Sequence, residues 1–233
     1  MKDLLDNIAW HTLAGSHSKF AIGDGHARRY APGFSPIVGF ANVRSPDFDA
    51  LARCCDAGDR FYCMDWSGAA PDGWQIELDS TMFRMVWDGS MPEAEAEGEA
   101  EAEEWVDAIS LRPEHAAQAV ELAALTRPGP FGPRTPELGE YFGCFEGDRL
   151  IAMAGERMCA GSLREISGVC THPDFQGQGL ARRLVAKLIR RQLLRGETPF
   201  LHVMRDNEGA HRLYGRMGFR DHCEAIVRVI SQR

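Results

Sequence analysis

Hydrophobic and polar positions repeat with two different periods after residue 105, and each period predicts a different kind of element. Short apolar runs of strand length occur at 105–111, 139–145, 150–158, 165–171, 199–204 and 224–230. Apolar residues at helical spacing predict helices over 113–126, 179–195 and 207–217. A run of strands, followed by a strand–helix–strand crossover, predicts an α+β (α/β mixed-sheet) fold for this part of the chain.

The first 90 residues predict a smaller α+β unit. Runs rich in β-branched and aromatic residues indicate strands at 37–41, 61–64, 74–78 and 82–87. Ser45-Pro46 places a capping residue before a proline, and apolar residues at helical spacing follow, so a helix is expected over 45–55. This unit contains no chemical motif, and its role is not defined by the sequence.

The two parts are separated by a strongly acidic segment. Seven of the twelve residues at 93–104 are Glu. Like charges at this density cannot bury a face, which is typical of a solvated linker, although Glu and Ala also favour a short helix. The sequence therefore predicts three parts: a unit at 1–90, a linker at 91–104 and a larger domain at 105–233.

Composition and charge exclude several functional classes. The net charge of −8 arises mainly in the acidic segment, so no basic field points to a nucleic-acid partner. No run of eighteen apolar residues and no secretory leader is present, so a membrane partner is not expected. The seven cysteines form no C-x-x-C pair, which predicts reduced thiols, no metal site and a cytoplasmic protein.

The segment at 167–181 contains the strongest chemical signal. A predicted strand ends at His172-Pro173, a loop containing Gly177 and Gly179 follows, and a long helix begins. Glycines allow close approach of the backbone to a ligand, and the free amides of a helix N-terminus favour anions such as a pyrophosphate. A plain strand-to-helix turn that needs two glycines is the structural alternative.

Two motifs together resemble a known family. Gln176-x-x-Gly179-x-Ala181 resembles the [RQ]-x-x-G-x-[GA] loop of the GNAT superfamily of acyl-CoA N-acyltransferases. A second GNAT-like signature follows at the expected distance, at 199–203 and 207–219. The resemblance covers about residues 106–233. The first 90 residues lack such a loop, and their element order is compatible with a degenerate GNAT-like half that does not bind CoA.

The resemblance implies acetyl-CoA as the acyl donor and assigns residues to it. Backbone amides of the glycine loop would hold the pyrophosphate, and the strand before the loop would pair with the pantetheine arm. An amide near Val169 would polarise the thioester carbonyl. The residues assigned to CoA are Val169, Cys170, Thr171, Gln176, Gly177, Gln178, Gly179, Leu180, Ala181 and Asn207.

The resemblance also implies direct acetyl transfer to a primary amine, without a covalent enzyme intermediate and without a metal. Tyr214 matches the general acid that protonates the departing thiolate, and a buried core aromatic is its alternative. An amine with a pKa of about 10.4 must lose a proton before it attacks, so a base is needed. Glu165 is the predicted base, with His172 and His202 as alternatives.

The acceptor is expected to be a small-molecule or peptide amine, whose identity the sequence does not define. The Pro/Gly-rich loop at 127–136 is predicted to shape the acceptor entrance. A catalytically silent acyl-CoA sensor is the alternative function. The sequence leaves open whether the chain forms a homodimer.

Overall fold

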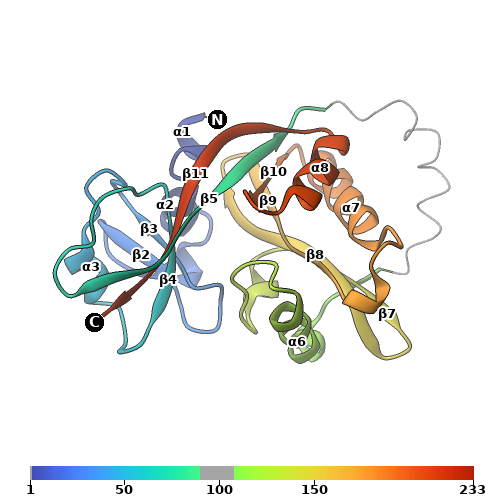
Figure 1. Cartoon of the computed structure of the whole chain (residues 1–233), viewed down its shortest axis with the longest axis horizontal. Coiled ribbons are helices and arrows are strands. Elements are labelled where there is room, and N and C mark those ends of the chain that lie inside the picture. The colour runs from blue at the N-terminus through green and yellow to red at the C-terminus, as the bar shows by residue number, and fades with distance from the viewer. Residues whose placement is uncertain (1, 90–107) are drawn as a thin grey trace.

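The computed structural model describes residues 2–89 and 108–233. Within these residues, eleven strands form one sheet in the order β1-β2-β3-β4-β11-β5-β10-β9-β8-β7-β6 (Figure 1). The predicted linker at 91–104 lies outside the described residues, as does the beginning of the strand predicted at 105–111. The observed architecture is the predicted mixed α+β sheet.

The first part of the chain contains more elements than the pattern predicted. Its helices are α1 (Lys2–Leu5), α2 (Ile8–Ala14), η1 (Ser18–Phe20) and α3 (Phe48–Ala52). Its strands are β1 (Ala21–Gly23), β2 (Ala27–Tyr30), β3 (Ile37–Phe40), β4 (Arg60–Met64) and β5 (Trp74–Trp87). The α3 helix begins later than predicted, because Asp47 rather than Ser45 is its cap and accepts a hydrogen bond from the amide of Ala50.

The second part follows the predicted order closely. Its strands are β6 (Ile109–Ser110), β7 (Tyr141–Glu146), β8 (Arg149–Ala160), β9 (Leu163–Thr171), β10 (Thr198–Met204) and β11 (Phe219–Gln232). Its helices are η2 (Pro113–His115), α6 (Ala116–Thr126), η3 (Thr135–Leu138), η4 (Pro173–Phe175), α7 (Leu180–Leu194) and α8 (Glu208–Arg216). The predicted apolar stripe of α7 is buried, with Leu184, Val185, Leu188 and Ile189 at most 2% exposed.

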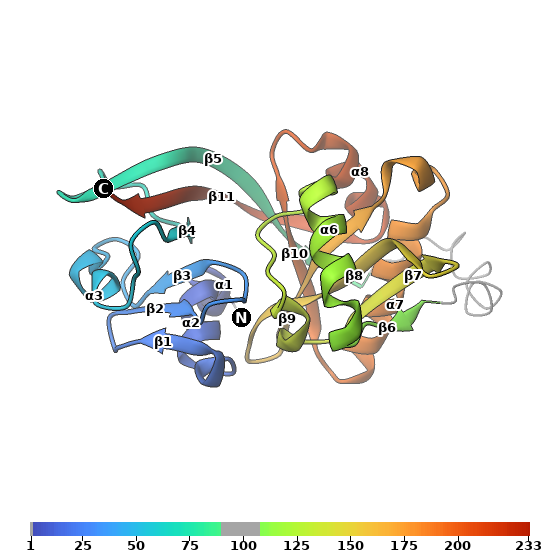
Figure 2. The ribbon, with the colours of Figure 1, turned by 90° about the horizontal axis from the view of Figure 1, so that it is seen from below.

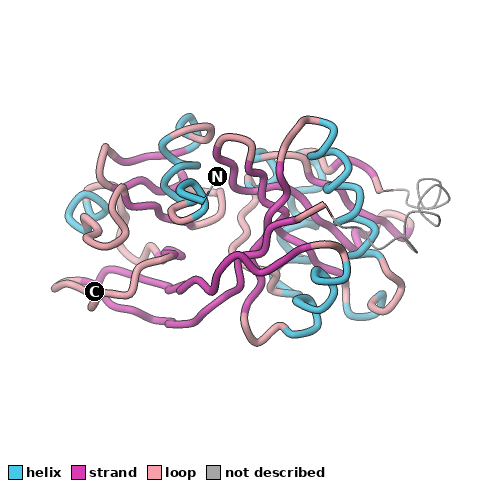
Figure 3. Tube along the Cα trace, turned by 90° about the horizontal axis from the view of Figure 1, so that it is seen from above, coloured by secondary structure: helices cyan, strands magenta, loops and turns pink. Residues whose placement is uncertain are grey.

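The long β5–β11 pair joins the two halves of the molecule (Figure 3). β11 pairs with β4 of the first half, and β5 pairs with β10 of the second half. Each half therefore supplies its last strand to the other half. This pairing also explains why the predicted strands at 74–78 and 82–87 form one strand, since β11 pairs with the polar residues between them.

The two halves follow a common plan. β3 and β4 are parallel neighbours connected through α3, and β9 and β10 are parallel neighbours connected through α7. A long antiparallel strand ends each half, as Figures 1 and 2 show. This repeat supports the interpretation of the first half as a reduced GNAT-like copy.

A shared apolar core fixes the halves against each other. Leu5 and Ile8 of the N-terminal helices belong to the same buried cluster as Met158 on β8, Phe200 on β10 and Val227 on β11. Fully burying side chains of this size contributes about 1.5–3 kcal/mol each. No helix in the described ranges combines the length and apolar character needed to cross a bilayer.

Candidate functional site

The parallel strands β9 and β10 part in the middle of the sheet. Their pairing runs from Leu163 opposite Thr198 to Ile166 opposite Leu201, and no further pair follows in the described structure. Beyond this point β10 still pairs with β5, while β9 still pairs with β8. The split therefore leaves one edge of each strand without a strand partner, as an inserted extended ligand would require.

β9 carries a β-bulge at the split. Ser167 pairs with Gly155 and Cys170 with Met153, so two residues of β9, Gly168 and Val169, face a single residue of β8. Gly168 has a φ of +63°, which favours glycine. Bulges redirect the backbone and side chains next to functional sites. The amide predicted to polarise the thioester belongs to this bulge.

The glycine loop lies between the end of β9 and α7. Gly177 and Gly179 have φ values of +78° and +75°, and a Cβ built on either one meets nothing within 4 Å. Gly179 is the N-cap of the fifteen-residue α7, and within the described residues no side-chain cap is found at this end. The first amides of a helix have no partner within the helix itself, and a helix N-terminus of this kind can bind a pyrophosphate.

The corresponding position in the first half is blocked. There, the helix after the first parallel strand is α3, which has five residues. The carboxylate of Asp47 already accepts a hydrogen bond from the amide of Ala50 at 2.8 Å. A negative charge at this helix end would repel a phosphate. This difference explains why the repeat would provide one CoA site rather than two.

The other residues assigned to the CoA arm surround the split. Cys170 is 7% exposed, and burial raises the pKa of its thiol to about 11, so it stays protonated. The buried Thr171 hydroxyl has no hydrogen-bond partner within the described residues, which is unusual for a polar group. Asn207 caps α8 through its side-chain oxygen, which accepts from the amide of Ala210 at 3.1 Å. The NH₂ group of the Asn207 side chain takes no part in this cap and can donate to another group.

Tyr214 lies on α8 among the core residues around the split. It is 7% exposed and packs edge-on against Phe219, with ring centroids 6.0 Å apart. Burial and the nearby Cys170 raise the pKa of Tyr214 to about 12, so its hydroxyl keeps a proton to donate. The side chain is thus both a core aromatic and a protonated acid.

Glu165 lies in a buried ion-pair network rather than in solvent. It is fully buried, and its carboxylate accepts two hydrogen bonds from Arg157, at 2.7 and 3.0 Å, and one from His202. Burial by itself would raise its pKa, but the charge of Arg157 and these hydrogen bonds outweigh that effect and lower it to about 2. Such a carboxylate accepts a proton only weakly.

The structure brings two of the predicted bases into one network. His202 Nδ1 lies 2.8 Å from Glu165, and Arg84 Nε donates to His202 Nε2 at 2.9 Å. Arg84, itself 1% exposed, pairs with Asp65 from the first half. The hydrogen bond from Arg84 requires a neutral His202 ring that donates through Nδ1, and burial lowers the pKa of His202 in agreement. The other alternative, His172, follows the bulge in the chain, and its Nε2 contacts Arg149 at 2.6 Å.

The arginines of this network were not among the site residues predicted from the sequence. Both Arg84 and Arg157 interrupt apolar strand patterns, at 82–87 and 150–158. A charged residue at an inward strand position rarely occurs without a buried partner. These interruptions are a sequence signal for buried charges. The partners of the two arginines do not follow from the pattern, because they depend on the order of the strands in the sheet.

The predicted acceptor loop is held by the first half of the molecule. The amide of Arg134 donates to the Gly33 carbonyl at 2.8 Å, and the Ser35 hydroxyl donates to the Pro130 carbonyl at 3.0 Å. A Cβ on Gly132 would lie 2.4 Å from the Gly33 carbonyl oxygen, so the two segments approach at backbone distance. The first half therefore positions the loop at 127–136.

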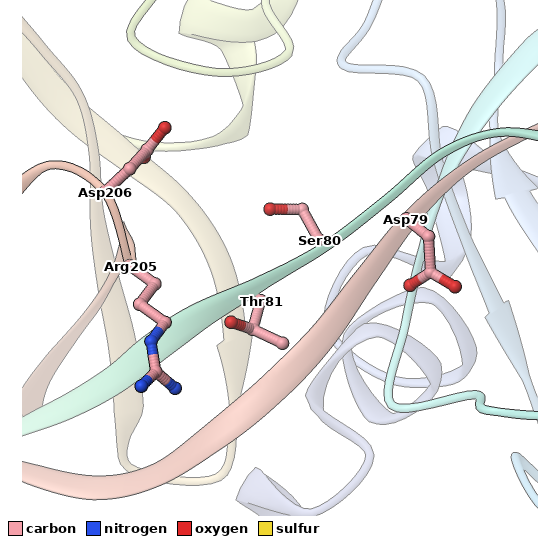
Figure 4. A pocket seen from close by; sticks show the side chains of 5 residues that line it. All are labelled: Asp79, Ser80, Thr81, Arg205 and Asp206. Carbon is pink, nitrogen blue, oxygen red and sulfur yellow. The ribbon is translucent and has the colours of Figure 1, made fainter.

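An open depression of about 530 Å³ lies where β10 leads into α8 (Figure 4). Asp79, Ser80 and Thr81 of β5 line it, together with Arg205 and Asp206. Asp79 pairs with Arg228, and Arg205 pairs with Glu224.

Comparisons with known proteins found a matching family model and several solved structures with a similar fold. Residues 141–229 match the model of the FR47-like protein family. Comparison with curated proteins gave no match. Two solved structures share the fold over 97% of this chain at 16% identity. One is a GCN5-related N-acetyltransferase-like protein from Streptococcus suis, with a TM-score of 0.63 and 92% of its own chain covered. The other is a GCN5-related N-acetyltransferase from Kribbella flavida, with a TM-score of 0.57 and 96% covered.

A third solved structure is similar in sequence as well as in fold. It is a GNAT-family protein from Novosphingobium aromaticivorans, 30% identical, with a TM-score of 0.83 and 98% of each chain covered. Because 98% of this chain is covered, the similarity includes the first half. The chain belongs to the GNAT family of acyltransferases.

Proposed function

We propose that the protein transfers an acetyl group from acetyl-CoA directly to the primary amine of a small molecule or peptide. The observation that carries this proposal is the open, uncapped N-terminus of α7 beside the split between β9 and β10. The amides from Gln176 to Ala181 would hold the pyrophosphate, and the split would hold the pantetheine arm. The freed edge of β9 and the unpaired Thr171 hydroxyl fit a polar, extended ligand.

In the proposed reaction, the amine nitrogen attacks the thioester carbonyl carbon and a C–N bond forms. The carbonyl electrons move onto oxygen, next to the bulge amide of Val169, and return as the C–S bond breaks. The thiolate takes a proton from Tyr214, and the nitrogen loses its proton to a base. Glu165 remains our predicted base, although its low pKa requires that its contacts with Arg157 loosen before it accepts a proton.

The same low pKa favours a second candidate function. A domain that binds acyl-CoA but has no effective base would act as a sensor. The two functions separate in one assay, in which free CoA is measured after acetyl-CoA is mixed with a panel of amines. Release that depends on an amine supports the transferase. Tight acetyl-CoA binding without release for every amine supports the sensor and contradicts the transferase.

Tyr214→Phe tests the acid. We expect kcat to fall by about 10²-fold, which is a typical contribution of general acid catalysis. CoA affinity should change little, because the ring stays in place. Steady-state kinetics and calorimetry measure the two quantities, with Tyr62→Phe on β4 as a control far from the split. Unchanged kcat would remove Tyr214 from the mechanism.

A further inference from the structure

Tyr141, on β7, has a buried hydroxyl with no hydrogen-bond partner in the described part of the chain. The residue is 2% exposed, and burial raises the pKa of its hydroxyl well above the ordinary value for tyrosine. The group therefore keeps its proton and is a hydrogen-bond donor. Leaving such a donor unsatisfied destabilises the folded state, and most buried polar groups are paired. Within the described residues, the hydroxyl is thus a donor that remains available to a bound ligand.

Two glycines determine where the Tyr141 ring lies. Gly155 on β8 pairs directly with Tyr141, and a Cβ there would lie only 2.1 Å from the ring. A Cβ on Gly168 of β9 would lie 3.1 Å from the ring edge and 3.3 Å from the hydroxyl oxygen. The side chain therefore reaches from β7 across β8 to β9. Its hydroxyl ends at Gly168, in the bulge of β9.

The end of this side chain coincides with the proposed reacting centre. Gly168 lies two positions after Ile166, the last residue of β9 that pairs with β10, and directly precedes Val169. Phe131, from the loop at 127–136, packs edge-on against the Tyr141 ring, with centroids 5.8 Å apart. The hydroxyl is thus enclosed between the predicted acceptor loop and the bulge.

The charged groups near Tyr141 are paired with each other. Arg157 and Glu165 are close enough to influence its pKa, but they bind each other through two hydrogen bonds. Tyr30, the neighbouring buried tyrosine, differs in this respect, because its hydroxyl contacts His17 at 2.8 Å. Of these two tyrosines, Tyr141 is the one whose donor is unused.

We propose that the Tyr141 hydroxyl is a second hydrogen-bond donor to the thioester carbonyl oxygen, beside the bulge amide. This proposal rests on the proposed acetyl transfer. A donor needs an acceptor atom, and the carbonyl oxygen is the acceptor that the reaction brings to the bulge. When the amine attacks, negative charge develops on this oxygen and the hydrogen bond strengthens. Tyr141 keeps its proton throughout, so its role is separate from that of Tyr214.

The experiment compares Tyr141→Phe with Tyr30→Phe. We expect Tyr141→Phe to lower kcat by about 10²-fold, the usual effect of losing one such donor. Its thermal midpoint should stay the same or rise, because an unsatisfied hydroxyl is removed. Tyr30→Phe should instead lower the thermal midpoint by about 2–4 °C through its lost hydrogen bond, with kcat nearly unchanged. Unchanged kcat in Tyr141→Phe would overturn the proposal and indicate that an internal water satisfies the hydroxyl.

A second readout does not depend on turnover. The carbonyl stretching frequency of acetyl-CoA labelled with ¹³C at the carbonyl is measured by infrared spectroscopy when bound to each protein. We expect a lower frequency in the wild type than in Tyr141→Phe, since a hydrogen bond weakens the C=O bond. Equal frequencies would contradict the proposed contact. A frequency difference without amine-dependent CoA release would support the contact and disprove the transferase function, so the two failures are distinguishable.

Discussion

Gly179→Glu is expected to abolish CoA binding while the protein stays folded. The new side chain would place bulk and negative charge where the amides of α7 meet the pyrophosphate. We expect the dissociation constant of CoA to rise by at least about 100-fold, which corresponds to about 2.7 kcal/mol. Isothermal titration calorimetry measures the affinity, and circular dichroism checks the fold.

Gly196→Glu is a closely matched control. Gly196 follows the opposite end of α7, has a φ of +71° against +75° for Gly179, and likewise has nothing within 4 Å of a built Cβ. The two substitutions therefore impose similar backbone strain, about 1–2 kcal/mol, and the same added charge. Gly196→Glu should leave CoA binding unchanged. Equal affinities of the two variants would show that the N-terminus of α7 does not hold the pyrophosphate.

Breaking the buried pair between Arg157 and Glu165 is expected to cause the largest loss of stability. Either Arg157→Met or Glu165→Gln leaves its partner charged, buried and unpaired, which typically costs about 3–5 kcal/mol. The double variant should lose much less than the sum of the two single losses, because no uncompensated charge remains. Chemical denaturation measures all three. Glu224→Gln, which breaks an exposed pair with Arg205, should cost less than about 1 kcal/mol.

The pair also predicts the direction of the pH dependence. The pKa of Glu165 is about 2 in the folded protein and 4.5 in the unfolded chain. The unfolded state therefore binds a proton first as the pH falls. The stabilisation, about 3 kcal/mol from this shift, is complete above pH 4.5 and disappears between pH 4.5 and 2. Glu165→Gln should lack this part of the acid transition, and an identical acid profile would contradict the assigned pKa.

Glu165→Gln also tests the predicted base, provided that the rate is measured below the unfolding temperature of the variant. If Glu165 removes the amine proton, kcat should fall and the pH–rate profile should change, with CoA affinity retained. A profile that matches the wild type would limit Glu165 to its structural pairing. The stability of Glu165→Gln and its kcat are measured separately, so a loss of stability is not taken for a loss of catalysis.

Local sequence alone determined much of the second half. The apolar period of α7 and the apolar runs of β7 to β10 predicted those elements correctly, because each segment carries a strong apolar pattern of its own. The glycines at 177 and 179 predicted a backbone that turns sharply before a helix, and both have positive φ values in the structure. In the first half, α2, β1 and β2 were not predicted, since these elements are short and their apolar patterns are weak.

Tertiary structure decided the properties that depend on residues distant in sequence. The exchange of β5 and β11 pairs segments more than a hundred residues apart, so no local pattern specifies it. The same sheet order brings Glu165 against Arg157 and His202, so the predicted base lies in a buried ion pair that no local pattern specifies. Likewise, only the adjacency of β7, β8 and β9 places the Tyr141 hydroxyl at Gly168. Sequence specified backbone conformation and apolar faces, because these follow from neighbouring residues. Folding specified charge environments and contacts, because these depend on which strands become neighbours.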